Sequence, residues 1–284
     1  MNVLMIGNSF SICVGKNLPQ IVRAGKKHQL SLTSAYIGGC SLETHANHLK
    51  NAEKDISITP YLITVWNSQD ARTGGKRRGN VLELLKNNKY DVISIQQASH
   101  LSWNYSSYQP YADVIISYIR KFNPQAKIII QQTWSYRNDA PKFAEWGFDS
   151  DEMYKRARNA YRSFAADQKF DIIPTGDAVD IYRKNSRRIF KALSEKELAK
   201  YRYPDLPPVA DDIVGVFFWH KMDDGSMKLC SDTIHLNYRG EYLQACVWYG
   251  KLFNEDPENI VWEHPKISSE ECRAMRSAAK AALG

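Results

Sequence analysis

The stretch Asn2-Val3-Leu4-Met5-Ile6 runs directly into Gly7-Asn8-Ser9-Phe10-Ser11 near the start of the chain. Its apolar run predicts a buried β-strand, and Gly7 lets the backbone turn tightly where that strand ends. Ser9 then lies between the strand and a helix predicted to follow it. A serine at such a turn can serve as a nucleophile, although capping the helix is the commoner role of serine at this position.

Short apolar segments alternate with amphipathic helical segments along most of the chain, which is typical of an α/β domain with a mainly parallel sheet. The predicted strands are 2–6, 30–37, 90–96, 127–132 and 170–173, and the main predicted helices are 18–26, 43–54, 81–86, 111–122, 151–167 and 238–253. The β-rich segment 61–66 and the turn-prone residues after it predict a hairpin at the sheet edge. We therefore predict a three-layer α/β/α sandwich around a five-stranded, mainly parallel core sheet.

We expect residues 1–284 to form one domain. The alternation weakens over 178–229, where only 194–202 has a helical pattern before a proline-rich stretch, and this predicts an insertion packed on the domain. A tail from about residue 257 ends in a predicted helix over 268–283.

Composition and charge exclude several classes of protein. The 284 residues are 43% hydrophobic and 24% charged, as in an ordinary globular protein. No apolar run approaches the roughly 18 residues that span a bilayer, and no signal peptide precedes the first strand. We expect no membrane partner and a cytoplasmic location as the sequence stands, or a periplasmic or secreted one if a leader was removed. The net charge is +7, but the basic residues are spread along the chain, so the sequence does not predict nucleic-acid binding.

In a parallel α/β sheet, functional residues gather at the carboxyl ends of the strands. Gly38 and Gly39 follow the second predicted strand and could offer backbone N–H groups to an oxyanion. Gln97 and His100 follow the third, and either side chain could serve the same oxyanion. Near the end of the chain, the Asp232-Thr233-Ile234-His235 word places a carboxylate and an imidazole one turn apart. Such a pair can orient and activate the imidazole, or belong to an ordinary surface turn.

Other polar and aromatic residues are candidates for binding. Asn8, Trp66, Trp103 and Trp134 lie close to predicted strand ends and could contact a substrate, the indole rings by stacking on sugars; core packing is the alternative for the rings. Cys40, Glu43, His45 and His48 lie close in sequence but lack the paired spacing of zinc ligands. The five cysteines include no CxxC pair. We expect no disulfide framework, metal or organic cofactor.

The words Gly7-Asn8-Ser9-Phe10-Ser11, Ile37-Gly38-Gly39-Cys40-Ser41-Leu42-Glu43 and Asp232-Thr233-Ile234-His235 stand in an order that resembles the SGNH/GDSL hydrolase superfamily. The resemblance covers about residues 2–253 and implies the flavodoxin-like fold of that superfamily. It implies Ser9 as nucleophile, His235 as general base and Asp232 as its orienting carboxylate. It also implies the N–H groups of Ser9 and Gly39 as oxyanion donors.

The third sequence block departs from the family. Gln96-Gln97-Ala98-Ser99-His100 stands where a Gly-x-Asn word is expected, so His100 or Gln97 would replace the asparagine donor. The resemblance implies hydrolysis of a small acyl ester, with an O-acetylated carbohydrate as one substrate class and no cofactor. The alternative is a catalytically silent carbohydrate-binding or glycan-binding protein on the same fold.

Overall fold

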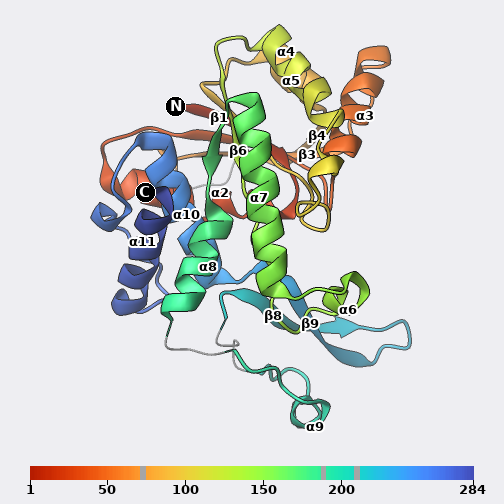
Figure 1. The fold of residues 1–284 in the computed structure, drawn as a ribbon, viewed down its shortest axis with the longest axis vertical. Helices are drawn as coiled ribbons and strands as arrows, with labels where there is room; N and C mark the ends of the chain where they lie inside the picture. Colours follow the sequence, from red (N-terminus) through yellow and green to blue (C-terminus); the bar gives the residue numbers. More distant parts are fainter. Residues whose placement is uncertain (71–74, 187–189, 208–211) are drawn as a thin grey trace.

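The structure is a computed structural model that describes residues 1–70, 75–186, 190–207 and 212–284. Parts of the predicted turn after residue 66 and of the predicted insertion at 178–229 lie outside the described residues. A seven-stranded sheet in the order β4-β3-β2-β1-β5-β6-β7 forms the centre of the molecule (Figure 1). Its strands are β1 (Asn2–Gly7), β2 (Ser31–Tyr36), β3 (Tyr61–Asn67), β4 (Arg77–Gly79), β5 (Val92–Ile95), β6 (Lys127–Gln131) and β7 (Asp171–Ile173).

Five neighbouring strands, β2, β1, β5, β6 and β7, are parallel, and β3 and β4 extend the sheet antiparallel at one edge. This confirms the predicted parallel core and the predicted edge hairpin. Parallel strands bring their carboxyl ends to one edge of the sheet, so the residues that follow β1, β2, β5 and β6 lie on the same side of the molecule.

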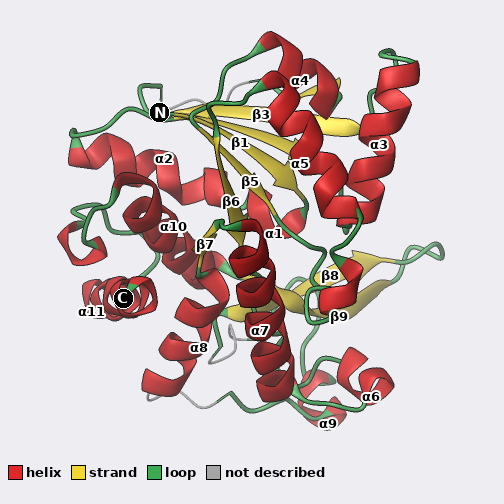
Figure 2. Ribbon diagram, turned by 45° about the horizontal axis from the view of Figure 1, so that its top comes forward, coloured by secondary structure: helices red, strands yellow, loops and turns green. Residues whose placement is uncertain are grey.

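Helices cover both faces of the sheet, as Figure 2 shows. They are α1 (Ser9–Ile12), α2 (Val14–Gly25), α3 (Leu42–Lys54), α4 (Val81–Asn87), α5 (Tyr111–Phe122), α6 (Lys142–Trp146), α7 (Ser150–Gln168), α8 (Thr175–Asn185), α9 (Glu195–Leu198), α10 (Tyr238–Phe253) and α11 (Ser269–Leu283). Successive side chains of β1 point to opposite faces and enter two separate cores. Val3 and Met5 pack with α2, α10 and α11, whereas Leu4 and Ile6 pack with α3, α4 and α5. The three-layer prediction is thereby confirmed.

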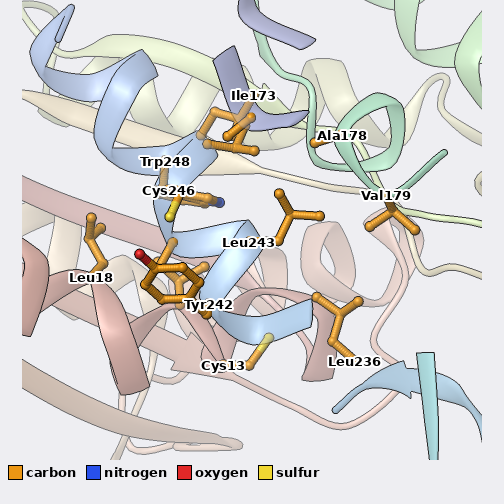
Figure 3. Packing of buried hydrophobic residues seen from close by; sticks show 14 of the residues in the cluster. Cys13, Leu18, Ile173, Ala178, Val179, Leu236, Tyr242, Leu243, Cys246 and Trp248 are labelled. Carbon is orange, nitrogen blue, oxygen red and sulfur yellow. The ribbon is translucent and has the colours of Figure 1, made fainter. Parts of the chain in front are cut away.

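Helix α10 is buried along most of its length. Tyr242, Leu243 and Cys246 pack among side chains from α2, α8 and β7, including Leu18, Val179 and Ile173 (Figure 3). A helix that is buried on nearly every side belongs inside a protein and not at its surface. The segment that leads into α10 is consequently held close to the sheet.

The chain before α10 differs from its prediction. Helix α8 continues to Asn185, the helical pattern at 194–202 yields only the short α9, and strands β8 (Val214–Lys221) and β9 (Met227–Leu236) pair as an antiparallel hairpin. Asp232 and His235 therefore lie on a strand, and the expectation that they lie one turn apart is wrong. The β8–β9 hairpin lies beside the carboxyl edge of the central sheet, below α7 and α8 in Figure 1.

Candidate active site

The turn after β1 presents Ser9 at the carboxyl edge of the sheet. Ser9 is the first residue of α1, so its backbone N–H has no acceptor within that helix. Gly7 is needed before the turn, because a Cβ there would lie 2.3 Å from the Ser11 hydroxyl oxygen. The Asn8 side chain caps α1 by accepting a 3.0 Å hydrogen bond from the Phe10 N–H. Local sequence thus fixes the position of the Ser9 hydroxyl.

Asn8 forms hydrogen bonds to the segments that follow β1, β5 and β2. Its side-chain oxygen also accepts a 2.6 Å hydrogen bond from Gln96 Nε2, and its side-chain nitrogen donates to the Cys40 carbonyl at 3.0 Å. Only 1% of Asn8 is exposed, so the expected side-chain contact with substrate is not met. Sequence reasoning missed Gln96, although a glutamine at the end of β5 was a visible signal.

Ser9, His235 and Asp232 form a continuous hydrogen-bonded line. His235 Nε2 lies 2.7 Å from Ser9 Oγ, and His235 Nδ1 lies 2.7 Å from Asp232 Oδ2. The second carboxylate oxygen of Asp232 accepts hydrogen bonds from the backbone N–H groups of Ile234 and His235, at 2.8 and 3.0 Å. The side chain of His235 is 42% exposed, so a substrate can reach the serine end of the line.

The environment keeps Asp232 ionised. Burial alone would raise the pKa of this carboxyl group, but hydrogen bonds from the His235 side chain and from two backbone N–H groups outweigh burial and lower its pKa to about 2. An ionised carboxylate accepts from Nδ1–H, which leaves Nε2 of a neutral imidazole as the acceptor facing Ser9. The arrangement can therefore remove a proton from the serine hydroxyl.

Trp134 supports this line from the interior. Its ring stacks on Phe10 with centroids 4.2 Å apart, and Phe10 in turn lies 5.6 Å from the His235 ring. The Trp134 indole N–H donates to the Ile234 carbonyl at 2.9 Å. Because Trp134 is 0% exposed, the expectation that it stacks on a substrate is wrong, and core packing is the correct alternative.

The other two predicted tryptophans lie in different places. Trp66 pairs with Leu32 near the start of β2, away from the carboxyl edge, and fills the space beside Gly15 of α2. Its predicted substrate contact is therefore wrong. Trp103 lies in the loop after β5 and is partly exposed, with Trp146 and Phe148 at centroid distances of 5.7 and 5.1 Å.

Gly39 occupies the tight turn after β2. Its φ of +63° suits glycine, and the Cys40 N–H closes the turn onto the Ile37 carbonyl at 3.4 Å. Gly38 and Gly39 are exposed, and no atom lies within 4 Å of the position that a Cβ on Gly39 would take. The turn is held beside Ser9 by the Asn8–Cys40 hydrogen bond.

The two candidates for a third oxyanion donor differ in availability. Gln97 is 0% exposed; its side-chain oxygen accepts from the N–H groups of Leu42 and Ala98, and its nitrogen donates twice to Ser107. Gln97 therefore has no N–H left for an oxyanion, and this alternative is wrong. His100 lies exposed in the turn after β5, where partial burial, followed by the charge of Lys142, lowers its pKa.

Neither a metal centre nor a membrane-spanning helix is found in the described ranges. These residues hold no group of three or more His, Cys, Asp and Glu side chains placed to bind a metal. His45 instead lies buried against Tyr61, with its Nδ1 2.9 Å from the tyrosine hydroxyl. No helix among the described residues is both long and apolar enough to cross a membrane.

Solved structures share this arrangement of strands and helices. A candidate SGNH hydrolase from Slackia heliotrinireducens matches with a TM-score of 0.51 and 18% identity, covering 89% of this chain and 98% of its own. The protein has the fold of the SGNH hydrolases, which confirms the fold expected from the resemblance.

A second structure matches the whole chain. It is a DUF4886 family protein from Bacteroides uniformis, with a TM-score of 0.78 and 24% identity, and the match covers 100% of this chain and 94% of that one. The family model of DUF4886, a domain of unknown function, matches residues 2–197, and the chain belongs to this family. No curated protein matches the chain.

Proposed function

We propose that this protein is a serine esterase that hydrolyses small acyl esters through an acyl-serine intermediate. The observation that carries the proposal is the pair of 2.7 Å hydrogen bonds from Ser9 through His235 to Asp232. A serine hydroxyl is a weak nucleophile until a base takes its proton, and the half-buried carboxylate of Asp232 orients the base and stabilises its protonated form.

In the proposed reaction, Ser9 Oγ forms a bond to the acyl carbon while its proton passes to His235 Nε2. The bond from the acyl carbon to the alcohol oxygen then breaks, and the alcohol leaves with that proton. Water next attacks the acyl-serine as His235 takes one of its protons; the acid is released and the proton returns to Ser9.

The backbone N–H groups of Ser9 and Gly39 are the proposed donors to the oxyanion. Two observations support them: Ser9 begins a helix and has no acceptor within it, and Gly39 lies in an exposed turn tied to Ser9 through Asn8. With the Gln97 amide fully engaged, His100 is the remaining side-chain candidate. Removal of one such donor typically costs about 100-fold or more in rate.

For the alcohol part of the ester we propose an O-acetylated carbohydrate. Trp103 and Trp146 are partly exposed neighbours, and Trp146 also lies 5.6 Å from Tyr136. The hydroxyl of Tyr136 is 2.8 Å from that of Ser99, and burial, together with the charge of Asp232, raises the pKa of Tyr136 to about 12. Flat rings of this kind suit stacking on sugars.

Hydrolysis of p-nitrophenyl acetate tests the chemistry. We expect Ser9→Ala to lower kcat by about 10⁴-fold or more, because the nucleophile is lost. Ser117→Ala, on the exposed side of α5, is the control and should keep wild-type activity. Equal activity in wild type and Ser9→Ala contradicts the proposal. Absence of activity in both, with glycan binding that survives Ser9→Ala, supports the silent glycan-binding alternative.

Acetate release from acetylated oligosaccharides tests the substrate class. We expect Trp103→Ala to raise KM several-fold for these substrates and to leave p-nitrophenyl acetate hydrolysis unchanged. Trp66→Ala should leave the KM for both substrates unchanged. Trp66 lies beside the start of β2, at the edge of the sheet opposite to Ser9. The carbohydrate assignment fails if acetylated sugars are not hydrolysed while p-nitrophenyl acetate is.

A further inference from the structure

The three residues of the Ser9–His235–Asp232 line belong to two different sheets. Ser9 follows β1 of the central sheet, whereas Asp232 and His235 lie on β9 of the separate β8–β9 hairpin (Figure 1). Among the described residues, neither strand of the hairpin pairs with a strand of the central sheet. The spacing between His235 and Ser9 therefore depends on loop and side-chain contacts.

The loop after β6 supplies such contacts on both sides of Asp232. The backbone N–H of Arg137 donates to the Thr233 carbonyl at 2.9 Å, and its Nη2 donates to the Ser231 hydroxyl at 2.7 Å. Arg137 thus holds the residue before Asp232 through its side chain and the residue after Asp232 through its backbone. Trp134 of the same loop holds the Ile234 carbonyl.

The guanidinium of Arg137 is completely buried. Its side chain is 0% exposed and makes two hydrogen bonds with Asp139, at 2.6 and 2.9 Å. Its charged end lies 4.7 and 5.6 Å from the ring centres of Phe190 and Phe217. An arginine stays charged when buried, and an apolar side chain of similar size would avoid the cost of removing that charge from water. Ordinary core packing does not account for arginine at this position.

Gly215 provides the room for this charge. It lies in β8 with a φ of +95°, at an irregularity in the pairing with β9. A Cβ on Gly215 would stand 2.5 Å from Arg137 Nη1 and 2.6 Å from the Asp232 carbonyl oxygen. The guanidinium and the backbone of Asp232 therefore occupy adjoining space that only glycine leaves open.

We propose that Arg137 is a positioning residue that fixes the β9 segment around Asp232, and through it the hydrogen bond from His235 to Ser9. The inference rests on the proposed function and adds a residue outside the triad to it. Loss of the Arg137 guanidinium would remove its hydrogen bond to Ser231 and let the hairpin shift against the central sheet. A displacement of about 1 Å between reacting groups can cost on the order of 100-fold in rate.

Hydrogen–deuterium exchange measures this placement without reference to activity. The N–H groups of Ile234 and His235 are bonded to Asp232, so a peptide covering 231–236 reports whether that arrangement is kept. We expect Arg137→Met to increase exchange in this peptide while peptides from the β1 turn stay protected. Arg276→Met is the matched control: it removes a mostly buried arginine of α11 that pairs with Glu263, and it should leave the 231–236 peptide unchanged.

Kinetics of p-nitrophenyl acetate hydrolysis completes the test. We expect Arg137→Met to lower kcat by about 100-fold with little change in KM, and Arg137→Lys to lose less because a charge remains. Ser231→Ala, which removes one exposed acceptor, should show smaller changes of the same kind and serves if Arg137→Met does not fold. Unchanged exchange in folded Arg137→Met and in Ser231→Ala overturns the inference. Full activity in Ser9→Ala would instead refute the esterase proposal and leave the exchange result standing.

Discussion

The Ser9 turn and the β8–β9 hairpin contribute to one candidate site but are built in different ways. The Ser9 turn follows a central strand and is fixed by neighbours in sequence, through Gly7 and the Asn8 cap. The hairpin lies outside the central sheet and is held by residues about 100 positions away, among them Trp134 and Arg137. The nucleophile is therefore set largely by local structure, with support from Gln96 and Cys40, whereas the base and its carboxylate depend on tertiary contacts.

This difference separates two ways of losing activity. Damage to the Ser9 turn should disturb the nucleophile and the fold of the sheet edge together. Damage to the hairpin should misplace His235 and leave the turn intact. Variants on each side can be compared with controls of the same residue type in the same kind of element.

The largest expected effect comes from the hairpin. Asp232→Asn should lower kcat by about 10⁴-fold, because an amide holds the imidazole in the tautomer that cannot accept the serine proton. The Ser9 turn should stay folded, and KM should change little. Asp224→Asn, in the turn of the same hairpin, is the control and should keep wild-type kcat. Comparable losses in both variants would show that the hairpin responds only to general damage.

A smaller effect is expected when the Ser9 turn is broken. Asn8→Ala removes hydrogen bonds to Phe10, Gln96 and Cys40, and should lower the free energy of unfolding by about 1–3 kcal/mol and kcat by about 10–100-fold. Asn80→Ala is the matched control, since Asn80 is also a buried helix cap, bonded to Glu83 and Ile56. Urea unfolding should show losses in both variants, and kinetics a loss in Asn8→Ala alone. Unchanged kcat in Asn8→Ala would contradict the role assigned to Asn8.

The smallest expected effect concerns acid stability of the hairpin side. The folded pKa of Asp232 is about 2, below its ordinary value of 3.8, so its charge stabilises the fold above pH 4 and this contribution is lost as the pH falls toward 2. The loss should be on the order of 2 kcal/mol. Urea unfolding at pH 5 and pH 2 should therefore show a larger decrease for wild type than for Asp232→Asn. Equal decreases would mean that Asp232 is not held as the structure indicates.

The same contrast explains what the sequence could predict. The parallel core, the edge hairpin and the turn at Ser9 follow from local patterns: apolar strands, a glycine at a strand end and alternating helices. The hairpin was missed because β8 and β9 are partly exposed strands outside the central sheet, although they are neighbours in sequence and pair with each other. The Asp-x-x-His spacing is compatible with a helical turn as well as with a strand, and only tertiary contacts decide between them.

The hydrogen-bond partners and the burial of side chains at the strand ends also could not be predicted from the sequence. Gln96 and Gln97 are adjacent and chemically identical, yet Gln96 reaches Asn8 and Gln97 reaches Leu42 and Ser107. Both residues follow β5 directly, and their partners come from other elements. Trp134 and Trp103 likewise follow neighbouring strands, and only burial shows that Trp134 packs inside while Trp103 stays partly exposed.

Labelling with a fluorophosphonate tests the central claim most directly, because the reagent reacts with a serine only when a base activates it. Mass spectrometry of the digested protein should find one adduct on the peptide that contains Ser9. Ser9→Ala should remain unlabelled, and Asp232→Asn should be labelled far more slowly than wild type. An unlabelled wild-type protein, or an adduct on a different serine, would contradict the assignment of Ser9, His235 and Asp232 as one catalytic unit.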